Sequence, residues 1–68
     1  MVTIKSLEWY DKNADEYGDI VLDDGNITFI LDMSKYCGKI ATIINRSNGY
    51  YALDIDEGTW DWSNEMFE

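Results

Sequence analysis

The sequence contains no histidine, a single cysteine and only five basic residues, and these shortages restrict what the protein can do. Histidine is the commonest general base near neutral pH and the commonest metal ligand, so its absence disfavours the usual hydrolytic and metal-dependent sites. One cysteine, Cys37, cannot form an internal disulfide, and no histidine is present to stabilise its thiolate. We therefore predict that Cys37 is a small buried hydrophobic residue, that the protein is not an enzyme, and that it binds no cofactor or metal.

Long apolar segments are also missing. A helix that crosses a bilayer needs roughly 20 apolar residues, whereas the longest apolar runs here are only a few residues long. The amino terminus lacks the basic residues and the apolar run of a signal peptide. Together with the unpaired cysteine, these absences predict a cytoplasmic protein.

What is abundant is negative charge. Fourteen Asp and Glu residues against five Lys and Arg give a net charge of −9. A conventional nucleic-acid-binding protein needs a cationic face that displaces counterions from phosphates, so we expect no direct contact with nucleic acid and none with anionic membranes. The charge favours a basic protein partner, and solubility alone is the simpler alternative.

Aromatic and aliphatic residues are frequent enough for a folded core. The chain has 46% hydrophobic and 15% aromatic residues in 68 positions, which is not the composition of a disordered segment. A domain of this size buries about 60% of the surface that its unfolded chain exposes. We expect one domain, residues 1–68, with the bulky carboxyl-terminal residues Trp60, Trp62, Met66 and Phe67 closing its core.

The first half of the chain predicts two strands that pair and one short helix. We expect a strand over residues 2–4, a helix over 7–13 that Ser6 caps, and strands over 20–22 and 27–31 on either side of a turn at 24–26. In the helix, Leu7 and Tyr10 are spaced to share one face.

The second half predicts a hairpin between two short turns. Residues 32–38 are typical of a helical turn that Asp32 caps and Gly38 ends. Strands follow over 39–45 and 50–56 around a loop at 46–49, then a closing strand through Trp60 and a last turn capped by Ser63. Alternation along the strand at 50–56 places Tyr51, Leu53 and Ile55 inward and Asp54 and Asp56 outward. The fold class is therefore mainly β, a small five-stranded barrel or strongly bent antiparallel sheet with one or two short helical turns.

The acidic residues gather in two stretches, 15–24 and 54–68, which are the candidate binding surface. Outward carboxylates two apart on a strand are separated by roughly 6.6–6.8 Å, about two phosphate steps along a nucleic-acid strand. They are therefore compatible with nucleic-acid mimicry. Two aromatic residues would add an apolar anchor. The candidate partner-binding residues are Asp15, Glu16, Asp19, Asp23, Asp24, Asp54, Asp56, Glu57, Trp9 and Tyr50.

The carboxyl-terminal half resembles a known group of proteins. Its pattern is Asp32-Met33, Tyr36, Gly38-Lys39, the pair Tyr50-Tyr51, and the ending Trp60-Asp-Trp62-Ser63-Asn-Glu65-Met66-Phe67. Over residues 28–68 this pattern resembles small SH3-like barrel proteins of phages and prophages of Gram-positive bacteria. Its ending is also similar to that of the SH3-like repeats of mind-bomb-type ubiquitin ligases. The resemblance implies an SH3-like barrel and a location in the cytoplasm of an infected or lysogenic bacterium, and it supplies no mechanism.

Two functions are compatible with these observations. Small acidic phage proteins are recurrent inhibitors of bacterial defence nucleases, including anti-CRISPR and anti-restriction proteins. By that analogy, this chain would bind a basic nucleic-acid-handling host protein, possible targets being a nuclease or an RNA-guided effector, and would occupy its nucleic-acid-binding surface. The alternative is an SH3-like adaptor that binds a peptide or protein through an aromatic groove and whose charge serves only solubility. Either form would be a monomer or a weak homodimer.

Overall fold

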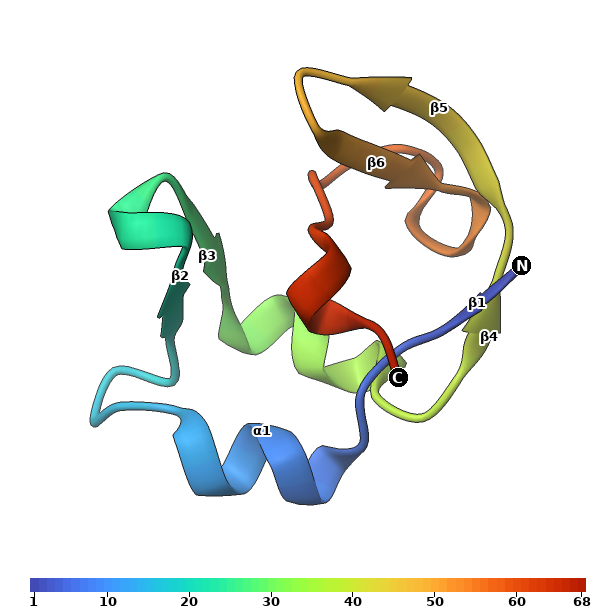
Figure 1. Cartoon of the computed structure of the whole chain (residues 1–68). Coiled ribbons are helices and arrows are strands. Elements are labelled where there is room, and N and C mark those ends of the chain that lie inside the picture. Colours follow the sequence, from blue (N-terminus) through green and yellow to red (C-terminus); the bar gives the residue numbers. More distant parts are fainter.

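Six short strands are paired two by two into three small sheets. The computed structural model describes all residues, 1–68. Its three antiparallel sheets pair β1 (Val2–Thr3) with β4 (Ile40–Ala41), β2 (Ile20–Leu22) with β3 (Ile27–Phe29), and β5 (Ile43–Ser47) with β6 (Tyr50–Leu53) (Figure 1). The mainly β class is confirmed, as is the pairing of the strands at 20–22 and 27–31. The three sheets do not close into a hydrogen-bonded barrel.

The predicted strand at 39–45 is interrupted at Thr42, which is one reason why the barrel stays open. The backbone N–H of Thr42 donates to Asp54 Oδ1 at 2.9 Å, and its carbonyl accepts from the N–H of Asp54 at 3.0 Å. Asp54 thus takes Thr42 out of the strand ladder and divides the strand into β4 and β5. Two single bridges then connect the sheets through the carboxyl-terminal segment, Tyr51 with Trp62 and Ile4 with Phe67.

The helix α1 (Leu7–Asn13) has the predicted bounds and the predicted cap, because the N–H of Trp9 donates to Ser6 Oγ at 3.1 Å. It packs on the core through consecutive aromatic rings. Trp9 meets Phe29 edge-on at a centroid distance of 5.2 Å, and Tyr10 lies 5.7 Å from the same ring. Leu7 is 54% exposed. Of the pair spaced to share one face, only Tyr10 is buried, and Trp9 makes the second contact with the core.

The connections are tighter than the sequence suggests. The loop predicted at 46–49 is a two-residue turn, since Ser47 pairs with Tyr50, and Asn48 and Gly49 have φ angles of 55° and 85°. Two positive φ angles are what a type I′ hairpin turn requires. Four 3₁₀ turns fill the remaining connections: η1 (Asp23–Gly25), η2 (Leu31–Tyr36), η3 (Asp54–Asp56) and η4 (Asn64–Met66).

Two predicted caps are only partly right. Turn η2 begins after Ile30 and has no side-chain cap, so Asp32 lies inside its first turn, whereas Gly38 ends the segment with φ 81° as predicted. Turn η4 does begin after Ser63, but the Ser63 hydroxyl is buried without a hydrogen-bond partner. The bonds of Ser63 are made by its backbone: its N–H donates to Met66 Sδ at 3.5 Å, and its carbonyl accepts from the N–H of Met66 at 3.0 Å.

The carboxyl-terminal segment closes the core, as predicted. Trp62 and Met66 have no exposed surface, and Phe67 is 9% exposed. Trp62 lies 5.8 Å, between ring centroids, from Phe29, the ring that also receives α1. Apolar burial of such large side chains contributes about 1.5–3 kcal/mol each. None of the helices is both long enough and apolar enough to span a membrane.

Candidate functional site

Asp56 does not lie on the surface, which corrects its predicted outward position. It is 6% exposed and sits in turn η3, because β6 ends at Leu53 and the strand alternation ends with it. Its Oδ2 accepts the N–H of Trp60 and the indole Nε1–H of Trp62, both at 3.1 Å, and its Oδ1 accepts the N–H of Gly58 at 3.1 Å. Asp56 therefore holds the core tryptophan in place and is unavailable to a partner.

The other carboxylates of turn η3 remain exposed but lie apart from the first acidic stretch. Asp54 is bonded to Thr42, and Glu57 follows the turn in the left-handed region with φ 56°. Figure 1 shows η3, in brown to orange, on the opposite side of the molecule from η1, in teal. Since Asp54 and Asp56 belong to a 3₁₀ turn, they do not form the predicted row of carboxylates at the spacing of every second phosphate.

The structure instead joins the two acidic stretches at Tyr50. The Tyr50 hydroxyl donates to Asp23 Oδ2 at 2.6 Å, connecting β6 with turn η1. The bridge between Tyr51 and Trp62 brings Asp61 alongside β6, and Glu65 follows in η4. The hydrogen bond to Asp23 raises the pKa of Tyr50, and burial and the charges of Asp23, Glu65 and Asp61 raise it further. We call Asp23, Tyr50, Asp61 and Glu65 the junction.

Sequence reasoning selected two members of the junction, Asp23 and Tyr50, and missed Asp61 and Glu65. The sequence did contain a signal for Asp61. Trp62 was expected in the core, and because neighbouring side chains of an extended segment point to opposite sides, Asp61 should then face the solvent. No comparable signal marked Glu65, whose position depends on the turn η4.

Turn η1 presents its carboxylates on a strained backbone. Asp23, Asp24 and Gly25 have consecutive positive φ angles of 51°, 53° and 89°. The left-handed region costs a non-glycine residue roughly 1–2 kcal/mol, less for Asp and Asn. Both carboxylates are exposed. Such strain is often retained where a backbone positions functional groups, which supports Asp23 and Asp24 as site residues.

The remaining acidic residues of the first stretch form a closed loop after α1. Asp15 Oδ1 accepts the N–H groups of Tyr17 at 2.9 Å and Asp19 at 3.0 Å, and the Tyr10 hydroxyl donates to the Gly18 carbonyl at 2.6 Å. Burial, followed by the charges of Asp19 and Asp11, raises the pKa of Tyr10. Asp15 and Glu16 are exposed and Asp19 is half-buried. These hydrogen bonds hold the acidic loop in one conformation, a few residues before η1 in the sequence.

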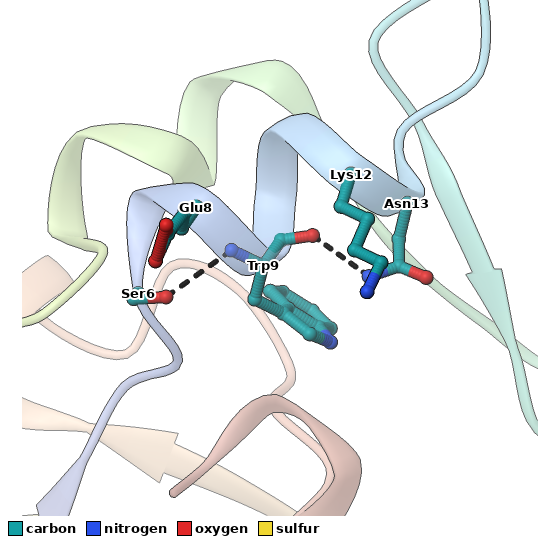
Figure 2. A pocket seen from close by; sticks show the side chains of 5 residues that line it. All are labelled: Ser6, Glu8, Trp9, Lys12 and Asn13. Carbon is teal, nitrogen blue, oxygen red and sulfur yellow. Dashed lines mark hydrogen bonds between the residues drawn. The ribbon is translucent and has the colours of Figure 1, made fainter.

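Trp9 lines an open hollow on the outer side of α1. The hollow measures about 650 Å³ and is bordered by Ser6, Glu8, Trp9, Lys12 and Asn13. Figure 2 shows the Trp9 ring beside the helix, with its carbonyl bonded to Asn13 Nδ2 at 2.8 Å. Trp9 is the only apolar residue of this lining. Its ring is partly used in the contact with Phe29, and the rest of the lining is polar.

Cys37 carries the one thiol of the chain. Cys37 is half-buried against the core, and burial, followed by the charge of Asp11, raises the pKa of its thiol. The thiol is therefore protonated near neutral pH. No group of three or more His, Cys, Asp or Glu side chains is arranged to hold a metal ion.

Comparison of the chain with protein-family models, with curated proteins and with solved structures gave no match.

Proposed function

We propose that this protein is a non-enzymatic acidic inhibitor that binds a basic nucleic-acid-handling host protein and covers its nucleic-acid-binding surface. The observation that carries the proposal is the junction, where Asp23 of the first acidic stretch accepts the hydroxyl of Tyr50 and the charges of Asp61 and Glu65, from the second stretch, act on the same hydroxyl. The partner would be a defence nuclease or an RNA-guided effector of a bacterial host, in the manner of anti-CRISPR and anti-restriction proteins.

The junction is suited to a cationic surface for two physical reasons. Exposed carboxylates of η1, of η4 and of the segment at Asp61 all act on the Tyr50 hydroxyl, Asp23 through a hydrogen bond and the other two through their charge, so a partner's Lys and Arg side chains would meet several acceptors together. Charge of one sign gathered in this way steers association and disfavours partners of the same sign. Tyr50, half-buried, would supply the apolar centre that binding hot spots commonly have.

A relationship to SH3-like barrels belongs to the same proposal. The two bridges place Trp62 beside β6 and Phe67 beside β1, while β4 continues into β5 after one residue. The carboxyl-terminal segment thus contacts both β6 and the chain just after β1, as the last strand of a small barrel would. This arrangement supports an open variant of that fold and, with it, an origin in a phage or prophage.

The alternative, an adaptor with an aromatic groove, has one supporting observation. Trp9 is half-buried and borders a hollow large enough for a few side chains of a peptide. The hollow is otherwise polar, with Glu8 and Lys12 of opposite charge on its border. Such a site would give weak affinity that depends little on salt, which separates it from the junction.

The proposal is tested with two variants of equal charge. The first replaces three carboxylates at or beside the junction, as Asp24→Asn, Asp61→Asn and Glu65→Gln. The control replaces three exposed carboxylates elsewhere, as Glu8→Gln, Asp11→Asn and Glu57→Gln. Each protein is immobilised and exposed to bacterial lysate at low salt. Proteins retained are identified by mass spectrometry, and the retained nuclease is then assayed with and without the inhibitor.

We expect a basic nuclease to be retained by the parent and the control, lost by the junction variant, and released at high salt because screened charges attract less. The parent and the control should both inhibit the same nuclease, and the junction variant should not. Retention by all three proteins at high salt would contradict the proposal and move attention to Trp9. Equal loss from both variants would show that only total charge matters.

A further inference from the structure

Strand β5 has a free edge. Its sheet contains only β5 and β6, and the far side of β6 is occupied where Tyr51 bridges Trp62. The N–H of Tyr51 donates to the Trp62 carbonyl at 2.8 Å, and the Tyr51 carbonyl accepts from the N–H of Trp62 at 2.9 Å. The backbone polar groups of Tyr51 therefore point away from β5. Because Arg46 lies directly opposite Tyr51, its own backbone N–H and carbonyl point to the free side of β5.

An edge of this kind can pair with a strand of another molecule. β5 is the longest strand of the protein, with five residues, of which the last four are exposed. It contains two consecutive isoleucines, which favour strands, and no proline that would prevent pairing. Such an exposed edge is a template for intermolecular strand pairing unless something blocks it.

The charge of β5 does not oppose a second copy of this chain. No acidic residue occurs from position 33 to position 53, and this segment holds three of the five basic residues. Two copies with a net charge of −9 repel each other most where their carboxylates face one another, and the edge of β5 brings none of its own. A strand that pairs with its own copy about a two-fold axis is also self-complementary. The strand from which β5 must be protected is therefore another β5.

The two common protections of an edge strand are incomplete here. An outward charged side chain often guards an edge, but the Arg46 guanidinium lies over the ring of Tyr51 in the neighbouring strand, 5.2 Å from its centroid. A bulge can also interrupt an edge, and the register of β5 shifts between Ile43 and Asn45. This bulge disturbs only the first part of the strand, so the backbone N–H of Arg46 needs another group to cover it.

The side chain of Asn45 covers this N–H. Its Oδ1 accepts the backbone N–H of Arg46 at 2.9 Å. A strand that pairs with β5 needs the same N–H, so it must first displace the Asn45 side chain. We propose that Asn45 closes the free edge of β5 against a second copy of this chain and so keeps the protein monomeric. This inference is independent of the proposed function, because it uses no residue of the junction.

The test compares the parent with Asn45→Ala and with a matched control, Asn26→Ala, by analytical ultracentrifugation at concentrations up to about 1 mM. Both asparagines are exposed, and Asn26 lies outside the strands. We expect Asn45→Ala to dimerise with an association constant about five-fold to a hundred-fold above those of the parent and the control, the range given by one freed N–H on each copy. Equal association constants for the three proteins would overturn the proposal.

Salt dependence separates this association from binding at the junction. Salt should strengthen the dimer of Asn45→Ala, because it screens the repulsion between two copies of net charge −9. Binding of a basic partner at the junction should weaken under the same conditions. A dimer of Asn45→Ala that salt dissociates would be held by charge attraction and would contradict strand pairing.

Hydrogen exchange tests the Asn45 contact itself. In dilute Asn45→Ala, the protection factor of the Arg46 amide should fall by about two-fold to ten-fold, the range expected for one hydrogen bond. Asn45→Asp keeps an oxygen in the same position, so this variant should retain the protection of Arg46 and remain monomeric. Unchanged protection in Asn45→Ala would show that the side chain does not cover the edge in solution and would overturn the proposal.

Amide NMR identifies the surface through which Asn45→Ala associates. Shifts that depend on protein concentration should fall on residues 44–47 of β5. If they fall instead around another exposed apolar residue, such as Val21 of β2 at 59% exposure, the copies associate elsewhere and the role assigned to Asn45 is wrong.

Discussion

The two acidic stretches of this protein have similar compositions and different uses. Residues 15–24 hold five carboxylates and residues 54–68 hold six, and neither stretch contains a basic residue. In the second stretch, Asp54, Asp56 and Glu68 accept backbone N–H groups of Thr42, Trp60 and Ser6, and so connect segments of the fold. In the first, Asp15 bonds only within its own loop and Asp23 bonds the Tyr50 hydroxyl.

The difference shows that the role of a carboxylate depends on the hydrogen-bond donors that it accepts from, and not on its charge alone. A buried carboxylate that accepts several N–H groups is part of the core, because removing it leaves those donors unsatisfied. An exposed carboxylate on a strained turn contributes little to the core and remains free for a partner. The following predictions test whether the two stretches divide in this way, beginning with the largest expected effect.

Asp56→Ala should lower the free energy of unfolding by about 2–4 kcal/mol, because three N–H groups lose their acceptor, including the buried indole Nε1–H of Trp62. The measurement is urea unfolding followed by tryptophan fluorescence. Asp54→Ala, an exposed residue of the same turn, is the control and should lose about 1 kcal/mol or less. Equal losses in the two variants would contradict the distinction between a buried carboxylate with three N–H donors and an exposed carboxylate with one.

Ser63→Ala should raise the free energy of unfolding by about 1 kcal/mol. The Ser63 hydroxyl is buried without a partner, and a polar group left unsatisfied in the core costs about 1–3 kcal/mol. The same urea experiment measures this change. A loss of stability would show that the hydroxyl has a bonding partner in solution and that the second stretch contains one more structural contact than described above.

Asp24→Gly should leave stability unchanged or raise it by up to about 1 kcal/mol, even though it removes an acidic side chain. Glycine adopts the positive φ of this position, 53°, without the cost that a side chain adds, and this gain outweighs the greater freedom of the unfolded chain. Asp24→Ala, which removes the charge and keeps the strain, is the control. A large loss in the glycine variant would place Asp24 among the structural carboxylates.

Tyr50→Phe should produce the smallest change at neutral pH and a distinct change at alkaline pH. The pKa of Tyr50 is raised in the folded state, so the stability that this group contributes is present below about pH 10 and is lost as the pH rises through the folded pKa. The parent should therefore lose stability above about pH 10 more steeply than the variant. The free energy of unfolding is measured in urea at pH 8 and at pH 10.5. If it falls by the same amount in the parent and in Tyr50→Phe, the Tyr50 hydroxyl does not bond Asp23.

Local sequence signals predicted the elements well, and their long-range contacts poorly. Ser6 before a short amphipathic segment identified α1, and the loop predicted at 46–49 identified the hairpin, although the observed turn is two residues shorter. The core position of Trp62 also followed from its size in so small a chain. The division of β4 from β5 could not be predicted, because it depends on Asp54, twelve positions after Thr42 in the sequence.

The candidate site was predicted in composition and not in arrangement. Alternation assigned Asp56 to the surface because the sequence carries no mark that β6 ends at Leu53. The indole of Trp62 and the N–H of Trp60 both donate to the buried Asp56 carboxylate. The stability that these hydrogen bonds contribute outweighs the preference of the strand pattern for an exposed Asp56. Asp23 and Tyr50 were both named, and only the fold shows that they bond each other.

The contacts between the amino-terminal and carboxyl-terminal segments also have a consequence for how the protein folds. The N–H of Ser6 donates to Glu68 Oε2 across 62 positions, and the N–H of Glu68 donates to the Thr3 carbonyl. Contacts of such long sequence separation form late and slow the search for the native state. Trp62 and Phe67 belong to the same late segment, so the core closes only when that segment docks, and the aromatic residues upstream stay exposed until then.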